Sequence, residues 1–247
     1  MGDKVYENNM KRRIQFEVGK IYHIFNRGVA KCQICESEND FWRFLQGFCL
    51  FNDKNSASNI LWQLEKTRGR LTLNILKEYL INDNERKPLA RILSYCIMPN
   101  HFHLMIEEIE EGGITKFMQK LGGGYARYFN NKHKRVGGLF QGRFKAVPVE
   151  DERQLLYLLV YINVINPGQL VEPNLKEEGI KDMEKVLQAA ENYSFSAHSD
   201  YLEKRGSLII KKGILKELLS TVAAYRELVA DVLQNKKYSE INHLFLE

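Results

Sequence analysis

The sequence predicts an α+β protein in which one antiparallel sheet carries helices on one face. Three observations lead to this fold class. The elements follow one another in the order strand, helix, strand, strand, helix. Two apolar segments flank Pro99 and Asn100, a turn signal that predicts a hairpin. The segments before and after this hairpin have apolar residues at helical spacing.

The first part of the chain supplies one strand and one helix. Residues 20–30 have the composition of a strand and end in a glycine turn. Residues 39–52 have the pattern of an amphipathic helix, with Asn39 or Asp40 as the N-cap. Residues 53–90 are polar and charged, and we expect a variable excursion with some helix there.

The hairpin and a second helix come next. Residues 90–98 and 101–109 are its two predicted strands, joined by the Pro-Asn turn. Residues 112–135 predict a helix, although Gly122–Gly124 weakens it by about 1 kcal/mol per glycine relative to alanine. Residues 136–149 read as a glycine-rich loop that leads into a short strand.

A third helix precedes a change in the character of the sequence. Residues 151–166 predict a helix that Asp151 caps and Pro167 ends. Beyond it the chain alternates between loops and charged helical segments. We therefore expect a domain over residues 1–170 and a mostly helical extension over 171–247.

The composition is ordinary for a soluble globular protein. The chain has 247 residues, of which 44% are hydrophobic and 27% charged. It contains no apolar run near the roughly 18 residues that a membrane helix needs, so we expect no membrane partner. Residues 1–20 contain no apolar signal core, and a cytoplasmic location is the expectation.

The charge is unevenly distributed. The net charge is +5, yet residues 112–149 contain no Asp or Glu and carry Lys and Arg interleaved with Phe and Tyr. Lys and Arg neutralise phosphates, and aromatic faces stack on unpaired bases, so we favour a nucleic acid over a merely solvated basic face. Gly142 would let the backbone approach a ligand closely. The predicted DNA-binding residues are Arg27, Lys132, Arg135, Gln141, Arg143 and Lys145.

Two histidines stand one residue apart in the second hairpin strand. Successive strand residues point to opposite faces, so His101 and His103 share a face and Phe102 points to the other. Two neutral imidazoles on one face can bind one divalent cation, and a hydrogen-bonded surface pair is the alternative. With a nucleic acid as partner, such a metal would serve phosphate chemistry.

Phosphate chemistry at such a metal also requires a nucleophile. Tyr157 and Tyr161 lie one turn apart on the predicted helix 151–166 and share a face. A phenol beside a metal-bound phosphate could attack it and form a phosphotyrosine. Core packing with a hydrogen-bonded hydroxyl is the alternative for both tyrosines.

Four short stretches occur in a specific order along the chain. They are "YHIFNRG" (22–28), "SYCIMPNHFHLMI" (94–106), "GGLFQGRFKA" (137–146) and "YINVINP" (161–167). In this order they resemble the single-tyrosine HUH transposases, most of all the REP-associated tyrosine transposases. The letters HUH mean His-hydrophobic-His. The resemblance covers about residues 15–170 and implies a ferredoxin-like α+β domain with the HUH strand at the centre of the sheet.

The resemblance also implies an activity. Members of this family cleave and rejoin single-stranded DNA with Mg²⁺ or Mn²⁺, and their substrates are hairpin-forming DNA ends. A tyrosine attacks a DNA phosphate and leaves a 5′-phosphotyrosine link and a free 3′-hydroxyl, which can reverse the step without ATP. By position, the implied metal ligands are His101 and His103, and the implied nucleophile is Tyr161.

The third metal ligand departs from the family pattern. In the family, a polar residue four positions after the tyrosine supplies it, whereas here that position holds Ile165. Asn166 follows one position later, as if a residue were inserted, and a helical bulge near Ile165 would bring it round. We therefore predict Asn166 as the third ligand. Asn163, water and DNA are the alternatives.

Three functions stay open on the sequence alone. The leading prediction is a DNA strand-transferase of the transposase type. The second is a hairpin-DNA-binding regulator on the same fold with weakened or lost catalysis, which the shifted asparagine supports. The third is a metal-dependent hydrolase in which water attacks, and it predicts that Tyr161→Phe is tolerated. The DNA target, the choice between monomer and homodimer, and the role of residues 171–247 are undetermined.

Overall fold

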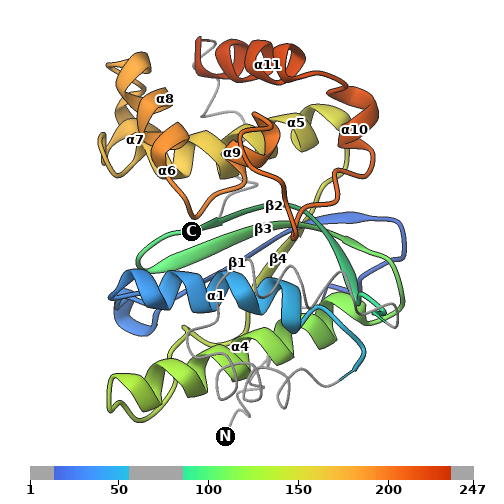
Figure 1. Cartoon of the computed structure of the whole chain (residues 1–247), viewed down its shortest axis with the longest axis vertical. Helices are drawn as coiled ribbons and strands as arrows, with labels where there is room; N and C mark the ends of the chain where they lie inside the picture. The colour runs from blue at the N-terminus through green and yellow to red at the C-terminus, as the bar shows by residue number, and fades with distance from the viewer. Residues whose placement is uncertain (1–13, 56–85, 235–247) are drawn as a thin grey trace, which may run out of the picture.

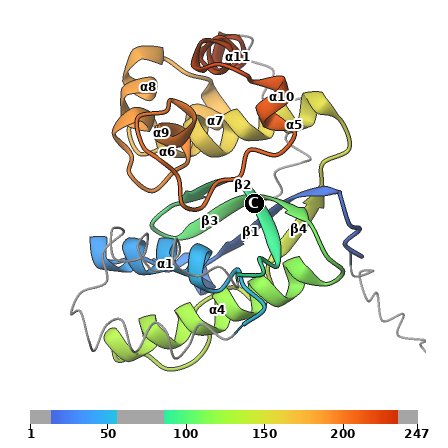
Figure 2. The same ribbon diagram turned by 45° about the vertical axis from the view of Figure 1, so that its right-hand side comes forward.

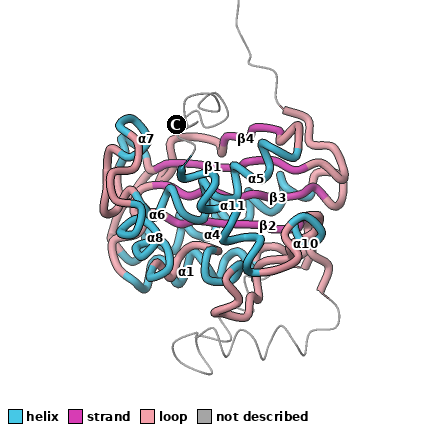
Figure 3. Tube along the Cα trace, turned by 90° about the horizontal axis from the view of Figure 1, so that it is seen from above, coloured by secondary structure: helices cyan, strands magenta, loops and turns pink. Residues whose placement is uncertain are grey.

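A four-stranded antiparallel sheet forms the centre of the protein. The computed structural model describes residues 14–55 and 86–234. The strands are β1 (Ile21–Arg27), β2 (Ala90–Ile97), β3 (His101–Glu108) and β4 (Lys145–Pro148). They lie in the order β2-β3-β1-β4, as the view from above in Figure 3 shows. The predicted hairpin is therefore confirmed, and the strand that holds the two histidines is an inner strand.

Two helices cover the lower face of the sheet in Figures 1 and 2. They are α1 (Glu38–Leu50) and α4 (Gly113–Lys132), and a short 3₁₀ turn, η1 (Val29–Lys31), precedes α1. The ring of Phe102 on β3 packs against Phe44 of α1, with ring centroids 5.1 Å apart. Phe102 thus points away from the face of its two histidine neighbours, as the strand alternation predicted.

The start of α1 differs from the prediction. Ser37 is the N-cap, whereas Asn39 and Asp40 lie inside the helix. The Asp40 carboxylate accepts the backbone N–H of Ser37 at 2.9 Å as part of a capping box, and it also accepts the Ser37 hydroxyl at 3.0 Å. Asp40 therefore serves the cap from the third helical position. Most of the predicted polar excursion, over residues 53–90, lies outside the described residues.

A long helical segment crosses the other face of the sheet. It consists of α5 (Glu152–Val160), a π-helical turn η2 (Tyr161–Ile165) and α6 (Asn166–Gly168). As predicted, Asp151 caps it by accepting the backbone N–H of Gln154 at 2.7 Å. The segment continues past the predicted stop at Pro167, because a proline in the first turn of α6 needs no backbone donor.

The extension adds further helices on the same side as α5 (Figure 1). They are α7 (Leu175–Glu178), α8 (Met183–Asn192), α9 (His198–Tyr201), α10 (Leu215–Leu218) and α11 (Val222–Gln234). The α+β class is confirmed, but the sheet carries helices on both faces rather than on one. Residues 157–168 are all buried, because they lie between the sheet and the extension. The domain boundary at residue 170 stays a prediction.

None of the helices in the described part of the chain is long and apolar enough to span a bilayer.

A chain of buried hydrogen bonds fastens the extension to the sheet. The Ser94 hydroxyl on β2 donates to Asn163 Oδ1 at 2.6 Å, and Asn163 Nδ2 donates to the Tyr225 hydroxyl at 2.9 Å. Tyr225 of α11 also contacts His198 Nδ1 at 2.8 Å. Four elements are thus joined through polar groups that water does not reach, and such groups are costly to leave without a partner.

We expect acid to weaken this docking through His198. Burial, opposed by the charge of Glu191, lowers the pKa of His198 from 6.5 to about 4. The unfolded chain takes up the proton first as the pH falls, so stability is lost between pH 6.5 and about 4. The loss should reach about 3 kcal/mol. Urea unfolding at several pH values measures it, and His198→Asn should flatten the dependence in this window. An equally steep loss in His198→Asn would contradict the assignment.

Candidate active site

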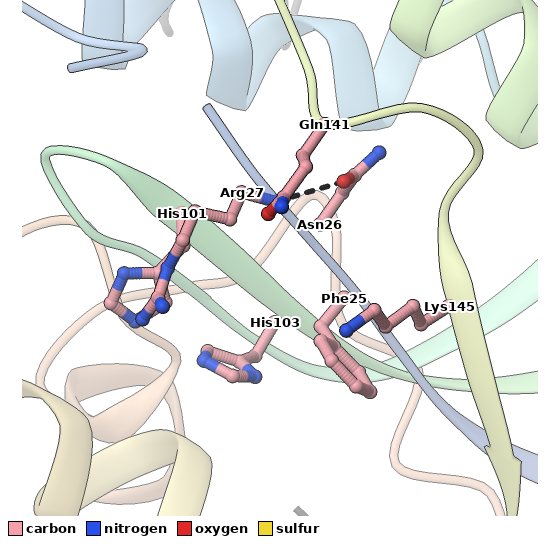
Figure 4. A pocket seen from close by; sticks show the side chains of 7 residues that line it. All are labelled: Phe25, Asn26, Arg27, His101, His103, Gln141 and Lys145. Atoms are coloured by element: carbon pink, nitrogen blue, oxygen red, sulfur yellow. Dashed lines mark hydrogen bonds between the residues drawn. The ribbon is translucent and has the colours of Figure 1, made fainter. Parts of the chain in front are cut away.

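The two histidines of β3 line one side of a pocket. Their ring centroids lie 5.0 Å apart, and both side chains are buried. Figure 4 shows the two rings on the same side of the strand. The inner position of β3 fixes its backbone through hydrogen bonds on both edges, so the two rings are held at a constant spacing.

The hydrogen bonds of these imidazoles indicate which nitrogen can bind a metal. His101 Nδ1 lies 2.6 Å from the side-chain oxygen of Asn100, which can only accept, so Nδ1 carries the proton. His103 Nδ1 lies 2.9 Å from His23 Nε2 on β1. A neighbour that holds Nδ1 orients Nε2 as the ligand, which is the usual arrangement of a metal-binding histidine.

Tyr161 lies against this histidine cluster. Its ring centroid is 5.5 Å from that of His103 and 6.1 Å from that of His23, edge to face in both cases. Its hydroxyl accepts a hydrogen bond from Lys176 Nζ at 2.7 Å, and the same ammonium lies 4.6 Å from the centre of the ring. The sheet and the helix above it thus bring together residues 58 positions apart in the sequence.

The π-helical turn accounts for the shifted asparagine. The backbone N–H of Asn166 donates to the carbonyl of Tyr161, five residues back rather than four. A turn of this width accommodates one additional residue, so Asn166 follows Tyr161 by one turn of helix. The predicted helical bulge is therefore present, between Tyr161 and Ile165.

Asn166 is fully buried. Its Oδ1 accepts from Gln169 Nε2 at 3.1 Å, and within residues 14–55 and 86–234 its Nδ2 has no hydrogen-bond partner. A half-turn of the amide exchanges oxygen and nitrogen, so this buried position can also present an acceptor. The alternative, Asn163, has both ends of its amide engaged, by Ser94 and Tyr225. Among the residues that the structure describes, the Asn166 amide thus has an unsatisfied end, whereas both ends of the Asn163 amide are engaged.

Three of the predicted DNA-binding residues share the pocket of the histidines. Seven residues line it: Phe25, Asn26, Arg27, His101, His103, Gln141 and Lys145. None of these seven is acidic, and Lys145 Nζ lies 5.6 Å from the centre of the Phe25 ring (Figure 4). Such a pocket has the charge and the donors to hold a phosphate.

The other predicted DNA-binding residues lie elsewhere. Lys132 Nζ forms an ion pair with Asp40 at 2.6 Å. Burial raises the pKa of Asp40, but hydrogen bonds, above all from Lys132 and Ser37, outweigh it and bring the pKa to about 2. The guanidinium of Arg135 lies 5.6 Å from the centre of the Phe129 ring. Arg143 lines a second cavity. The structure thus does not gather all six residues at one place.

Two residues of the site were not predicted from the sequence. His23 lies on β1 and contacts His103 from that neighbouring strand. Lys176 was not singled out, because it lies in a charged segment, "NLKEEGIK", that resembles any solvated helix. Its position 15 residues after Tyr161 has no periodic relation to that tyrosine.

The donor atoms of this site indicate which metal ions it could hold. Of the residues that the structure describes, no three His, Cys, Asp or Glu side chains form a group that could hold a metal ion. The available donors are instead two imidazole Nε2 atoms and a buried amide. Imidazole together with oxygen donors suits Mn²⁺ better than Mg²⁺, which prefers oxygen alone. The donor set therefore fits a divalent cation whose remaining ligands are water or a phosphate.

Comparisons with known proteins agree with the resemblance seen in the sequence. Residues 59–164 match the family model described as "Transposase IS200 like". A solved structure, "Structure of the REP associates tyrosine transposase bound to a REP hairpin", aligns with 81% of this chain and 92% of its own at 12% identity, with a TM-score of 0.36. A search of the curated proteins finds no match. Over residues 59–164 the chain is thus similar to IS200-like transposases.

Proposed function

Proceeding from this similarity to IS200-like transposases, we propose that the protein is a strand-transferase of single-stranded DNA that acts through a 5′-phosphotyrosine. One observation carries the proposal: the Tyr161 ring lies 5.5 Å from that of His103, on the sheet face that His101 shares. A nucleophile and a pair of metal-binding groups are thereby adjacent to a pocket suited to a phosphate.

The residues have distinct roles in the proposed reaction. The Tyr161 hydroxyl gives its proton to solvent and its oxygen attacks the phosphorus, the bond from phosphorus to the 3′-oxygen breaks, and the leaving oxygen takes up a proton from solvent to become a hydroxyl. His101, His103 and Asn166 would hold a divalent cation, which supplies charge stabilisation at the phosphate. Arg27 and Lys145 bind the flanking phosphates, and reversal by a 3′-hydroxyl restores the tyrosine.

The substrate we propose is a hairpin with an unpaired flank. A duplex has no free strand end that can bend into a pocket, whereas an unpaired strand can present one phosphate to the histidines. The acid-free segment 112–149 would attract such a strand. The sequence resemblance supports hairpin ends in particular, and the solved transposase compared above is bound to a REP hairpin.

Covalent capture tests the proposal. The full chain is incubated with labelled hairpin DNAs that carry single-stranded flanks, with Mn²⁺ or with a chelator, and is then denatured. We expect a denaturant-resistant protein–DNA adduct with Mn²⁺ and none with the chelator. A nuclease digest should leave a phosphotyrosine. DNA cleavage without any adduct would contradict the covalent route.

The inactive-regulator alternative loses its main support. It depended on an asparagine displaced by one position, and the π-helical turn brings Asn166 one turn after Tyr161. We therefore retain the transferase as the proposed function.

Lys176 is expected to assist the nucleophile. Its ammonium donates to the Tyr161 oxygen and so favours the phenolate over the phenol. Lys176→Met should slow adduct formation roughly 10- to 100-fold at neutral pH, since a hydrogen bond to a charged group contributes about 1.5–3 kcal/mol. The rate should recover as the pH rises.

Two further variants separate this role from a structural one. Lys176→Arg keeps the charge and should retain most of the rate. Lys181→Met removes an exposed lysine of the same extension, whose side chain is 71% exposed, and should have no effect. A uniform loss at every pH in Lys176→Met would contradict the role assigned to the ammonium.

A further inference from the structure

A second cavity lies on the face of the sheet opposite the histidines. It has a volume of about 290 Å³, and its walls come from β1, α1, β3, α4 and the loop before β4. Phe44 and Phe102 form part of its wall. Ligand sites begin at roughly 300 Å³, so the cavity has room for one small molecule and not for a duplex.

The walls of this cavity are flat and aromatic. Phe140 lies 5.8 Å from Phe102 and 6.4 Å from Phe44 between ring centroids, and Phe144 completes the loop side. Polar groups lie among these rings: Arg143, Gln119 and Asn26 also line the cavity. Flat apolar walls with a few hydrogen-bonding groups match a nucleobase, which stacks by its faces and pairs by its edge.

Two glycines of α4 border the cavity. Gly122 and Gly123 line it, and an added Cβ at either position would meet no atom within 4 Å. Neither has the positive φ angle that would require glycine, although glycine weakens a helix interior. Gly124 differs, because a Cβ there would approach Phe51 to 2.5 Å. Packing explains Gly124, whereas Gly122 and Gly123 leave empty space.

The cavity and the histidine pocket have one lining residue in common. Asn26 lines both, and its Nδ2 donates to the carbonyl of Gly142 at 3.2 Å. Gln141 faces the first pocket and Arg143 the second, although they are two residues apart on one loop. A single strand that crosses this loop can place a phosphate in one pocket and a base in the other.

We propose that this second cavity receives one unpaired nucleobase of the DNA strand whose phosphate occupies the histidine pocket. The proposal rests on the proposed action on single-stranded DNA. The absence of acidic residues from 112–149, which includes α4 and the loop, is consistent with a polyanionic ligand. The captured base would fix the position of the scissile phosphate along the strand.

The test combines an abasic scan with a variant that fills the cavity. Hairpins with a single-stranded tail carry one abasic site at each tail position in turn, and binding to the full chain is followed by fluorescence anisotropy. We expect one position at which loss of the base weakens binding about 10-fold. In Gly122→Leu the intact and abasic tails should bind alike. Leucine favours helix, so the variant should remain folded.

Controls and outcomes separate this proposal from the proposed function. Asn131→Leu, on the exposed side of α4, should keep the abasic effect. Equal binding of all abasic tails to the wild type, or a persisting abasic effect in Gly122→Leu, would overturn the base pocket even if the adduct forms. An abasic effect that Gly122→Leu removes would uphold the pocket even if no adduct forms. Failure to bind any tail would overturn both.

Discussion

We expect Tyr161→Phe to abolish the covalent adduct and to leave hairpin binding within a few-fold of the wild type. The substitution removes one oxygen atom and keeps the ring, which packs edge to face against His103 and His23. The hydrogen bond from Lys176 is lost, and we expect the free energy of unfolding to fall by no more than about 1–2 kcal/mol. Covalent capture with equal protein and DNA measures the adduct.

Tyr157→Phe is the matched control. Tyr157 lies one turn earlier on the same helical segment and is also buried, so the two variants have comparable effects on packing. We expect a normal adduct from Tyr157→Phe. An adduct that survives in Tyr161→Phe and disappears in Tyr157→Phe would make Tyr157 the nucleophile. Continued cleavage by Tyr161→Phe without an adduct would favour the hydrolase.

Removing the histidine pair should eliminate both metal binding and the adduct. In His101→Ala/His103→Ala both proposed imidazole ligands are lost, and we expect His23 and the Asn166 amide alone not to retain a divalent cation. Changes to groups that merely orient a ligand already cost about 10- to 100-fold in affinity or activity, so we expect a loss above 100-fold. Mn²⁺ binding, measured by electron paramagnetic resonance, should disappear together with the adduct.

A single substitution and a variant of a distant histidine serve as controls for this experiment. His101→Gln keeps an oxygen donor, and its adduct should partly recover at high Mn²⁺ concentration. His133→Asn alters a histidine that follows the end of α4 and contacts Asp40 and Glu36, and it should behave as the wild type. Normal Mn²⁺ binding by the double variant would show that the ion is held elsewhere, and the ligand assignment would then be wrong.

Local patterns in the sequence predicted much of the fold and part of the site. The hairpin depends on a Pro-Asn turn between two apolar strands, and the common face of His101 and His103 depends only on the period of a strand. The bulge near Ile165 was implied by the resemblance to the transposase family, in which the polar residue lies one position closer to the tyrosine. Each of these features is determined within a few residues of the chain, where sequence patterns are informative.

Features that depend on distant contacts were not predictable in the same way. His23 approaches His103 across 80 residues because β1 and β3 pair, and no local pattern gives this register. Lys176 reaches Tyr161 only because the chain reverses after α6. The helix cap at Ser37 was missed because three neighbouring polar residues can all serve as caps, and the geometry of the buried Asp40 carboxylate decides among them.

The π-helical turn has a consequence for everything that follows it in the chain. One residue inserted into an ordinary α-helix rotates all later residues by about 100° and moves them 1.5 Å along the axis. Here the wider turn absorbs that rotation within Tyr161–Ile165. The downstream helices therefore keep their angular phase against the sheet, and Lys176 still reaches its partner. Deleting Ile165 should convert the π-helical turn to an α-helical turn and leave the orientation of the downstream helices unchanged. The segment should therefore tolerate a change of length that would rotate the residues after it in a regular helix.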